Sequence, residues 1–293
     1  MENLVFNSTI DLKREGKSFY WASFFLPKNS KKNAGTLYSI CRYFDDIADK
    51  NDEDKTKYLQ DSIVEIKNNK SNQINMFLNK NNIHNSIFIA LIEGLILDQK
   101  EIKIQNKDEL IKYSYHVAGT VGLMMSKIIG AEHKKSARSA IDLGIGMQLT
   151  NIARDVYEDA QMKRIYVPAD WIPNINLANL NTSKNISHNQ EKKISNAIHK
   201  IINLADMFYN NGFAGLKYIP FSARLGIFIA ANIYRGIGVK IKKTEKKYIR
   251  TRVYLTLSEK TLITLKSILI FIFIPLINFK YKKIRDNFPN ENL

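Results

Sequence analysis

Acidic and amide side chains recur at helical spacing within residues 144–168. Four of them follow one another at intervals of three, four and four residues: Gln148, Asn151, Asp155 and Asp159. That spacing places them on one stripe of an α-helix. The positions between them are largely apolar, which predicts a buried helix. Buried carboxylates are costly unless a cation compensates them, so this stripe predicts a metal ion or a cationic partner.

A matching stripe occurs within residues 31–50. Its polar members fall at intervals of four, three and four residues: Tyr38, Arg42, Asp45 and Asp49. Leucine, isoleucine and phenylalanine flank them, and Asp46 lies one position further round the helix. An acidic pair near a helix C-terminus opposes the helix dipole. Stability alone therefore does not account for these carboxylates.

Two aspartate pairs that face each other across a cavity suit Mg²⁺. This ion prefers carboxylate oxygens and commonly binds one or two of them together with substrate phosphates. Such a site would bind a diphosphate and stabilise it as a leaving group. Arg42 and Arg154 would add charge-assisted contacts to phosphate oxygens. A cavity otherwise lined by aromatic and aliphatic side chains would hold an isoprenoid tail and shelter a carbocation.

The rest of the chain predicts the helices that must position these stripes. With 13 Gly and 6 Pro in 293 residues, the composition favours helices over a sandwich or barrel. No linker or repeat is visible, so a single domain over residues 1–293 is expected. Gly119 and Gly122 predict a kink beside the cavity. Helical patterns cover residues 18–26, 31–50, 52–68, 85–97, 108–129, 134–161, 190–210 and 220–243, with polar connections at 69–82 and 173–189.

The N-terminal residues predict a cytoplasmic location. Glu2, Asp11 and Glu15 interrupt the first residues, and no apolar signal-peptide core follows them. Cys41 is the single cysteine, which excludes an intrachain disulfide and argues against a zinc cluster.

Basic charge is concentrated towards the C-terminus. Of the net charge of +16, residues 240–285 contribute +11, from 13 Lys and Arg against two Glu. The apolar stretch 262–279 lies in this region, but Lys266 and Pro275 interrupt it, leaving less than the ~20 residues that a spanning helix needs. It is expected to be a core helix or an anchor on an anionic membrane surface, on the inner face of the membrane. Nucleic-acid binding is not expected, because no nucleic-acid motif accompanies the charge.

Five segments in order resemble the squalene/phytoene synthase family. They are SFYWASFFLP (18–27), LYSICRYFDDIAD (37–49), YHVAGTVGLMM (115–125), GMQLTNIARDVYEDAQMKRIYVP (146–168) and IPFSARLGIFIAANIYRGIGVKI (219–241). The paired DDIAD and RDVYED motifs in these contexts are specific. YHVAGTVGLMM favours the phytoene branch, as found in bacteria, over squalene synthase.

The resemblance implies a fold and a reaction. The fold is all-α, the isoprenoid synthase fold, a single helical domain with a central cavity between two Asp-rich helices. The reaction is the Mg²⁺-dependent head-to-head condensation of two geranylgeranyl diphosphates, through prephytoene diphosphate, to phytoene, the first step of carotenoid biosynthesis. Whether Mn²⁺ replaces Mg²⁺ is left open. NADPH is not expected, and the chain has no G-x-G-x-x-G fingerprint.

The resemblance also implies roles residue by residue. The expected metal ligands are Asp45, Asp49, Asn151, Asp155 and Asp159. The four aspartates and Tyr234 are the expected catalytic residues. The residues expected to bind, orient or enclose substrate are Ser18, Tyr38, Arg42, Gln148, Asn151, Arg154 and Arg252. Asp46 and Glu158 are expected to assist without binding the metal themselves. The lysines just before Arg252 fit a membrane surface as well as a substrate.

Two alternative functions stay open from the sequence. The same fold with shorter substrates would use farnesyl diphosphate and make a C30 product of the squalene or dehydrosqualene type. A family member without catalytic activity would act in assembly or binding at a membrane. The second alternative is disfavoured because all four predicted aspartate ligands are present.

Overall fold

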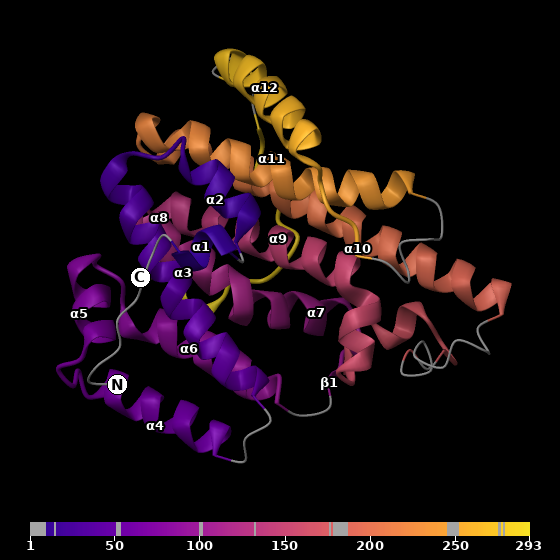
Figure 1. The fold of residues 1–293 in the computed structure, drawn as a ribbon, viewed down its shortest axis with the longest axis horizontal. Coiled ribbons are helices and arrows are strands. Elements are labelled where there is room, and N and C mark those ends of the chain that lie inside the picture. The colour runs from indigo at the N-terminus through magenta and orange to yellow at the C-terminus, as the bar shows by residue number, and fades with distance from the viewer. Residues whose placement is uncertain are drawn as a thin grey trace.

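A computed structural model gives the fold and describes residues 10–14, 16–50, 54–99, 102–131, 133–175, 177, 187–244, 252–274, 277 and 279–293. Helices form nearly all of its regular structure (Figure 1). The first half contains α1 (Ile10–Arg14), α2 (Lys17–Ser23), α3 (Lys28–Asp49), α4 (Lys55–Lys67), α5 (Gln73–Lys80), α6 (Asn85–Leu97), β1 (Ile102–Lys103), α7 (Lys107–Ser114), the π-helical turn η1 (Tyr115–Gly119) and α8 (Thr120–Ile128). The second half contains α9 (Lys134–Gln161), β2 (Arg164–Ile165), η2 (Ala169–Trp171), α10 (His188–Ala214), η4 (Leu216–Tyr218), α11 (Phe221–Lys243), α12 (Leu257–Phe273) and η7 (Pro289–Asn292).

The long helix α9 lies at the centre of the bundle, in contact with α8, η1, α10 and α11 (Figure 1). Its residues Ile145, Leu149 and Ile152 belong to the main hydrophobic core. The backbone of α8 approaches it closely. A Cβ added to Gly122 would lie 2.2 Å from the carbonyl oxygen of Ala140. The glycine therefore allows α8 to pack directly against α9.

A short parallel pairing joins the segment after α6 to the segment after α9. Ile102 pairs with Arg164 and Lys103 pairs with Ile165. The amide of Ala169 then donates to the carbonyl of Ile104 at 3.0 Å. These bonds fix the chain beyond the acidic end of α9 against the end of α6.

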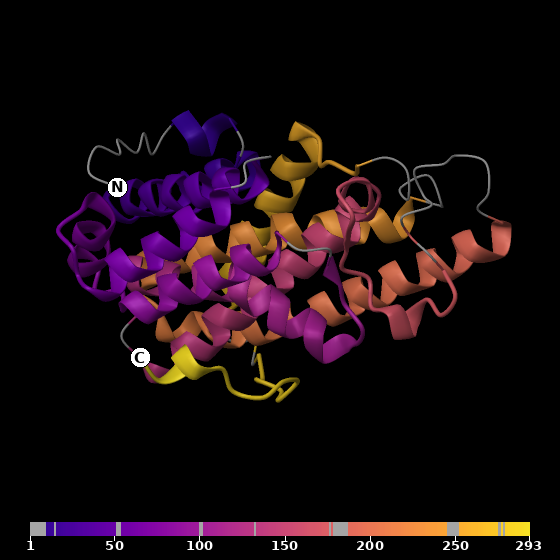
Figure 2. The ribbon, with the colours of Figure 1, turned by 90° about the horizontal axis from the view of Figure 1, so that it is seen from below.

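The C-terminal part of the chain covers two opposite sides of the bundle. Helix α12 lies outside α11, and the indole of Trp21 donates to Thr264 on it at 3.0 Å (Figure 1). The last residues run along the side away from α1 and α12 (Figure 2), where Arg285 pairs with Asp142 on α9. No helix in the described part of the chain has both the length and the apolarity to cross a bilayer.

The structure confirms the all-α fold and departs from the sequence expectations in a few places. Residues 69–82 are not merely a polar connection, because α5 forms there with an Asn72 side-chain cap. The expected helix over 108–129 is divided into α7, η1 and α8, so the interruption before Gly122 is a π-helical turn. Part of the expected loop at 173–189, the lysines at 246–247 and residues 275–276 and 278 of the apolar stretch lie outside the described residues.

Candidate active site

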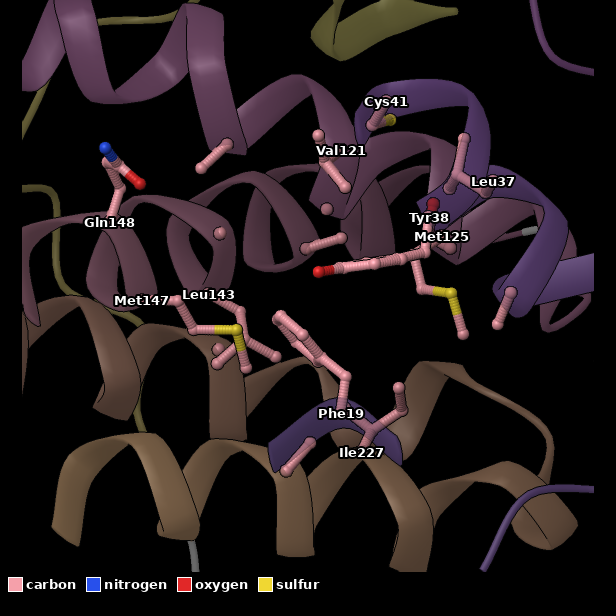
Figure 3. A pocket seen from close by; sticks show the side chains of 18 of the residues that line it. Phe19, Leu37, Tyr38, Cys41, Val121, Met125, Leu143, Met147, Gln148 and Ile227 are labelled. Atoms are coloured by element: carbon pink, nitrogen blue, oxygen red, sulfur yellow. The ribbon is translucent and has the colours of Figure 1, made fainter. Parts of the chain in front are cut away.

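A cavity of about 420 Å³ lies between α2, α3, α8, α9 and α11. This volume falls in the range of roughly 300–1,000 Å³ that small-molecule sites occupy. Its middle is apolar: Phe19 and Ile227 face Tyr38 across the space, with Leu143 and Met147 on the α9 side (Figure 3).

The two ends of the cavity differ in polarity. Polar side chains gather at one end: Arg42, Asp45, Asp98, Gln148 and Asn151. Apart from Tyr38 and Tyr113, the rest of the lining is apolar or small, and along α9 it extends back to Ser136. Ser136 and Asn151 lie 15 positions apart on one helix, which corresponds to about 22 Å along its axis. The cavity therefore combines a charged end with a long apolar body.

The α3 side of the polar end carries three aspartates. Arg42 donates to Asp45 at 2.9 Å and contacts Asp46 at 2.5 Å. Asp49 accepts a hydrogen bond from Arg164 at 2.7 Å. Burial raises the pKa of Asp45 to about 6; Arg42 opposes this rise, and the charge of Asp49 adds to it.

The α9 side carries the second aspartate pair. Arg154 donates two hydrogen bonds to Asp155, at 2.7 and 2.6 Å. Arg252 contacts Asp155 at 3.0 Å and Glu158 at 3.0 Å. Burial, followed by repulsion from Asp155, raises the pKa of Asp159 to about 8. Negative charge is thus only partly compensated on both sides.

The donor set fits Mg²⁺ bound together with a phosphate-bearing substrate. Among the described residues, no group of three or more Asp, Glu, His or Cys side chains lies close enough to form a complete protein site. Mg²⁺ does not need one, because it commonly takes one or two carboxylates and completes its shell with water and phosphate. The buried Oδ1 of Asn151 has no hydrogen-bond partner in the described structure, as expected of an oxygen kept for a ligand.

Aromatic side chains adjoin the polar end. The Phe19 ring lies 4.8 Å from that of Tyr234 and 6.4 Å from that of Tyr38. Burial raises the pKa of Tyr234, so its hydroxyl stays protonated at neutral pH. These faces suit an apolar or cationic ligand.

The predicted site residues fall into three groups. Those that line the cavity are Tyr38, Arg42, Asp45, Gln148 and Asn151. Asp49 and Asp159 interact electrostatically with the lining residues Asp45 and Asp98. Next to Asp159, Asp155 pairs with Arg154 and Arg252. Tyr234 lies against the cavity-lining Phe19, and Ser18 is the residue before it on α2; neither is among the lining residues. The roles assigned to the residues of all three groups remain predictions.

Sequence reasoning missed two polar residues of the lining, Asp98 and Tyr113. The signal for Asp98 was its position directly after an almost wholly apolar helix, where a carboxylate is conspicuous. Tyr113 falls in the expected helix over 108–129, but no spacing pattern linked it to the aspartates. Asp98 and Tyr113 join the lining through tertiary contacts, which local periodicity does not reveal.

Comparison with known proteins gives the family of this chain. The family model for squalene/phytoene synthase matches residues 12–259. The chain is 32% identical over 251 residues to a 15-cis-phytoene synthase of Enterobacter agglomerans, covering 77% of this chain and 81% of that protein. It is 30% identical over 268 residues to a phytoene synthase of Rhodobacter capsulatus, covering 85% of this chain and 77% of that protein.

A solved structure shares the fold. A crystal structure of a dehydrosqualene synthase superposes with a TM-score of 0.76 at 23% sequence identity, covering 90% of this chain and 95% of the other. Fold and site together define a helical prenyltransferase. The chain belongs to the squalene/phytoene synthase family. The reaction class is the head-to-head condensation of isoprenoid diphosphates, in isoprenoid and carotenoid biosynthesis.

Proposed function

We propose that the chain condenses two geranylgeranyl diphosphates to phytoene, through prephytoene diphosphate, with Mg²⁺. The observation that carries this proposal is the division of one cavity into a charged end and a long apolar body. The phytoene synthases among the relatives support the choice of substrate and product.

The charged end would bind the diphosphates. Guanidinium groups bind phosphate oxygens strongly, and this end has three of them, on Arg42, Arg154 and Arg252. The residues that would hold Mg²⁺ are Asp45, Asp49, Asn151, Asp155 and Asp159. When bound, Mg²⁺ neutralises the charge of the leaving diphosphate. The arginines pair with the aspartates, so Mg²⁺ held by the carboxylates would leave the guanidinium groups to bind phosphate.

The apolar body would hold the prenyl tails. The α9 wall runs for about 22 Å and carries small side chains at Ser136, Ser139, Ala140 and Gly144. Small side chains leave room for an extended chain, which favours a C20 over a C15 substrate. Phe19 and Tyr38 lie where their faces would shelter a carbocation and exclude water.

Product analysis tests the proposal. Purified protein is incubated with geranylgeranyl or farnesyl diphosphate, with Mg²⁺, with Mn²⁺ or with EDTA, and with or without NADPH. We expect phytoene from the C20 substrate with Mg²⁺, no need for NADPH, and no product in EDTA. A C30 product from farnesyl diphosphate alone would move the chain to the dehydrosqualene or squalene type. No turnover of either substrate by folded protein would favour the non-catalytic alternative.

We also propose that α12 binds an anionic membrane surface, on the cytoplasmic side. Leu265, Leu269 and Ile272 on this helix are more than half exposed, and the region around them is strongly basic. Apolar side chains flanked by Lys and Arg are typical of an interfacial helix. The lipophilic product gives a reason for such a contact.

Vesicle sedimentation tests the membrane proposal. We expect binding to vesicles containing phosphatidylglycerol at low salt, weaker binding to neutral vesicles, and a large loss for Leu269→Glu. Val64→Glu is the matched control, because Val64 on α4 is exposed to a similar extent, 55% against 61%. Protein that stays in the supernatant with anionic vesicles at low salt would refute the proposal.

A further inference from the structure

The C-terminal segment, residues 279–293, packs across the outside of the bundle (Figure 2). It lies beyond the part of the chain that the family model matches, which ends at residue 259. The side chain of Asn211 on α10 bonds both the amide and the carbonyl of Lys282, at 2.9 Å each. Lys127, in the last turn of α8, donates to the carbonyl of Leu293 at 3.0 Å. The segment is therefore held both near its start and at its end.

Buried charges fix the register of this segment. The side chains of Arg285 and Glu291 are 2% and 6% exposed, and Arg285 pairs with both Glu291 and Asp142 on α9. Apolar side chains of the same volume often stabilise a fold as well as a buried ion pair does, so covering the bundle does not by itself require these charges. A shift of the segment by one residue would leave them buried without partners, which is costly. The network therefore holds particular residues of the segment at particular places.

Two of the residues held in this way meet the π-helical turn η1. The Phe288 ring stacks on the Tyr115 ring with centroids 3.8 Å apart and 9° between their planes. Asn290 donates to the Tyr115 hydroxyl at 3.1 Å and to the carbonyl of Ser86 on α6 at 3.3 Å. Tyr115 is the first residue of η1 and is buried. The C-terminal segment thus fixes the outer side of this turn.

The inner side of η1 is part of the cavity wall. Val117 and Ala118, in the same turn, line the cavity, whereas Tyr115 is not among the lining residues. A Cβ added to Gly144 on α9 would lie 2.2 Å from the carbonyl oxygen of Ala118. The two backbones therefore touch without a side chain between them that could absorb a shift. Single π-helical turns are rare and often occur at functional sites, and a displacement of Tyr115 would move this part of the wall.

We propose that Phe288 is a positioning residue for substrate binding: through Tyr115 it holds η1 against α9 and so fixes the wall of the apolar body that receives the prenyl tail. Asn290 supports Tyr115 from the side of α6. Phe288 acts through η1, because it does not itself line the cavity. Apolar contacts with the tail are the same in the ground state and the transition state, so the effect falls on KM rather than on kcat. This inference rests on the proposed function.

Hydrogen exchange tests the positioning directly and needs no turnover, so it decides this point even if the proposed function is wrong. We expect the amides of residues 115–122 to exchange faster in Phe288→Ala than in the wild type, because exchange reports local opening. The matched control is Phe279→Ala. Phe279 belongs to the same segment and is also half-buried, but it packs on Phe213 of α10, with ring centroids 5.4 Å apart. Exchange in η1 that is no faster in Phe288→Ala than in Phe279→Ala would overturn the proposal.

Steady-state kinetics test the consequence for binding, with whichever prenyl diphosphate the wild type turns over. We expect Phe288→Ala to raise KM about tenfold, the effect of about one misfitting methylene in an apolar pocket, and to leave kcat within about twofold of the wild type. Phe288→Tyr keeps the ring against Tyr115 and should keep the wild-type KM. Phe279→Ala removes a side chain of the same size and should leave KM unchanged. An equal rise of KM in the two alanine variants would mean that the segment acts through general stability, and would overturn the proposal.

Discussion

Helix α9 carries two acidic sites that are built in opposite ways. In its first half, Asp142 is fully buried and accepts hydrogen bonds from Arg285 at 2.6 Å, from Tyr281 at 2.7 Å and from Asn211 at 2.7 Å. In its second half, Asp155 and Asp159 are half-buried, and Asp159 meets the negative charges of Asp155, Glu158 and Asp98, the residue that follows α6. The same residue type thus meets matched donors in one place and excess negative charge in the other.

The first site, which we call the latch, holds the C-terminal segment against α9. Arg285 also binds Glu291, and the Phe288 ring stacks on Tyr115 with centroids 3.8 Å apart. Burial raises the pKa of Asp142, but the charge of Arg285 opposes the rise. The comparison teaches that burial alone does not mark a functional carboxylate. What marks it is the crowding of like charges, as around Asp159, which a cation can compensate.

The largest effect on activity is expected from Asp45→Asn. This change keeps the size of the side chain but removes a charge from the proposed metal site. We expect activity to fall about 10³-fold, comparable to removing a key electrostatic group, while the melting temperature falls little or rises. Turnover assays with saturating Mg²⁺, paired with thermal melts, check both. Wild-type turnover would show that Asp45 does not serve the metal or the diphosphate.

A substitution in the latch should lower the stability of the fold rather than the activity. Asp142→Ala leaves Arg285 buried without its main partner, and breaking such a pair costs about 3–5 kcal/mol. We expect a large drop in the free energy of unfolding, measured by urea titration, with near-normal kcat in the fraction that stays folded. Asp286→Ala is the control, because that carboxylate is exposed and pairs with Lys283 at the surface. A stable but inactive Asp142→Ala would reverse the contrast.

Periodicity predicted much of the fold and part of the site. Helical patterns gave α6 and α9 at their observed bounds, and the two polar stripes placed Asp45 and Asn151 on facing helices. The Asn-rich α5 was missed because its local composition resembles a loop. Asp98 and Tyr113 were missed because their contact joins residues 15 positions apart on different helices, and a stripe on one helix does not reveal it. The latch was missed for the same reason, since Asp142 and Arg285 lie 143 positions apart.

Without metal, the free energy of unfolding should depend on pH through Asp159 in the second site. The pKa of Asp159 is raised from 3.8 to about 8 in the folded state. The folded state therefore holds a proton that the unfolded state releases, so stability falls as pH rises from about 4 to about 8. Asp159→Asn should make that slope shallower and raise the melting temperature at pH 7 in EDTA. Thermal melts at several pH values check this.

Two comparisons sharpen that experiment. Mg²⁺ should raise the melting temperature of the wild type more than that of Asp159→Asn, because the ion binds the ionised carboxylate. Asp286→Asn, at an exposed position, should leave the slope as it is in the wild type. Equal slopes in the wild type and Asp159→Asn would mean that Asp159 does not titrate in this window.

The smallest effect is expected from Arg252→Lys, at the edge of the second site. Arg252 contacts both Asp155 and Glu158 at 3.0 Å, a fork that a lysine ammonium does not reproduce. Since its side chain is about one-third exposed, we expect little change in stability and a rise of about tenfold in KM for the diphosphate substrate. Arg14→Lys on α1, outside the cavity lining, is the matched control. If KM stays unchanged while salt sensitivity of membrane binding changes, Arg252 belongs to the basic surface rather than to the site.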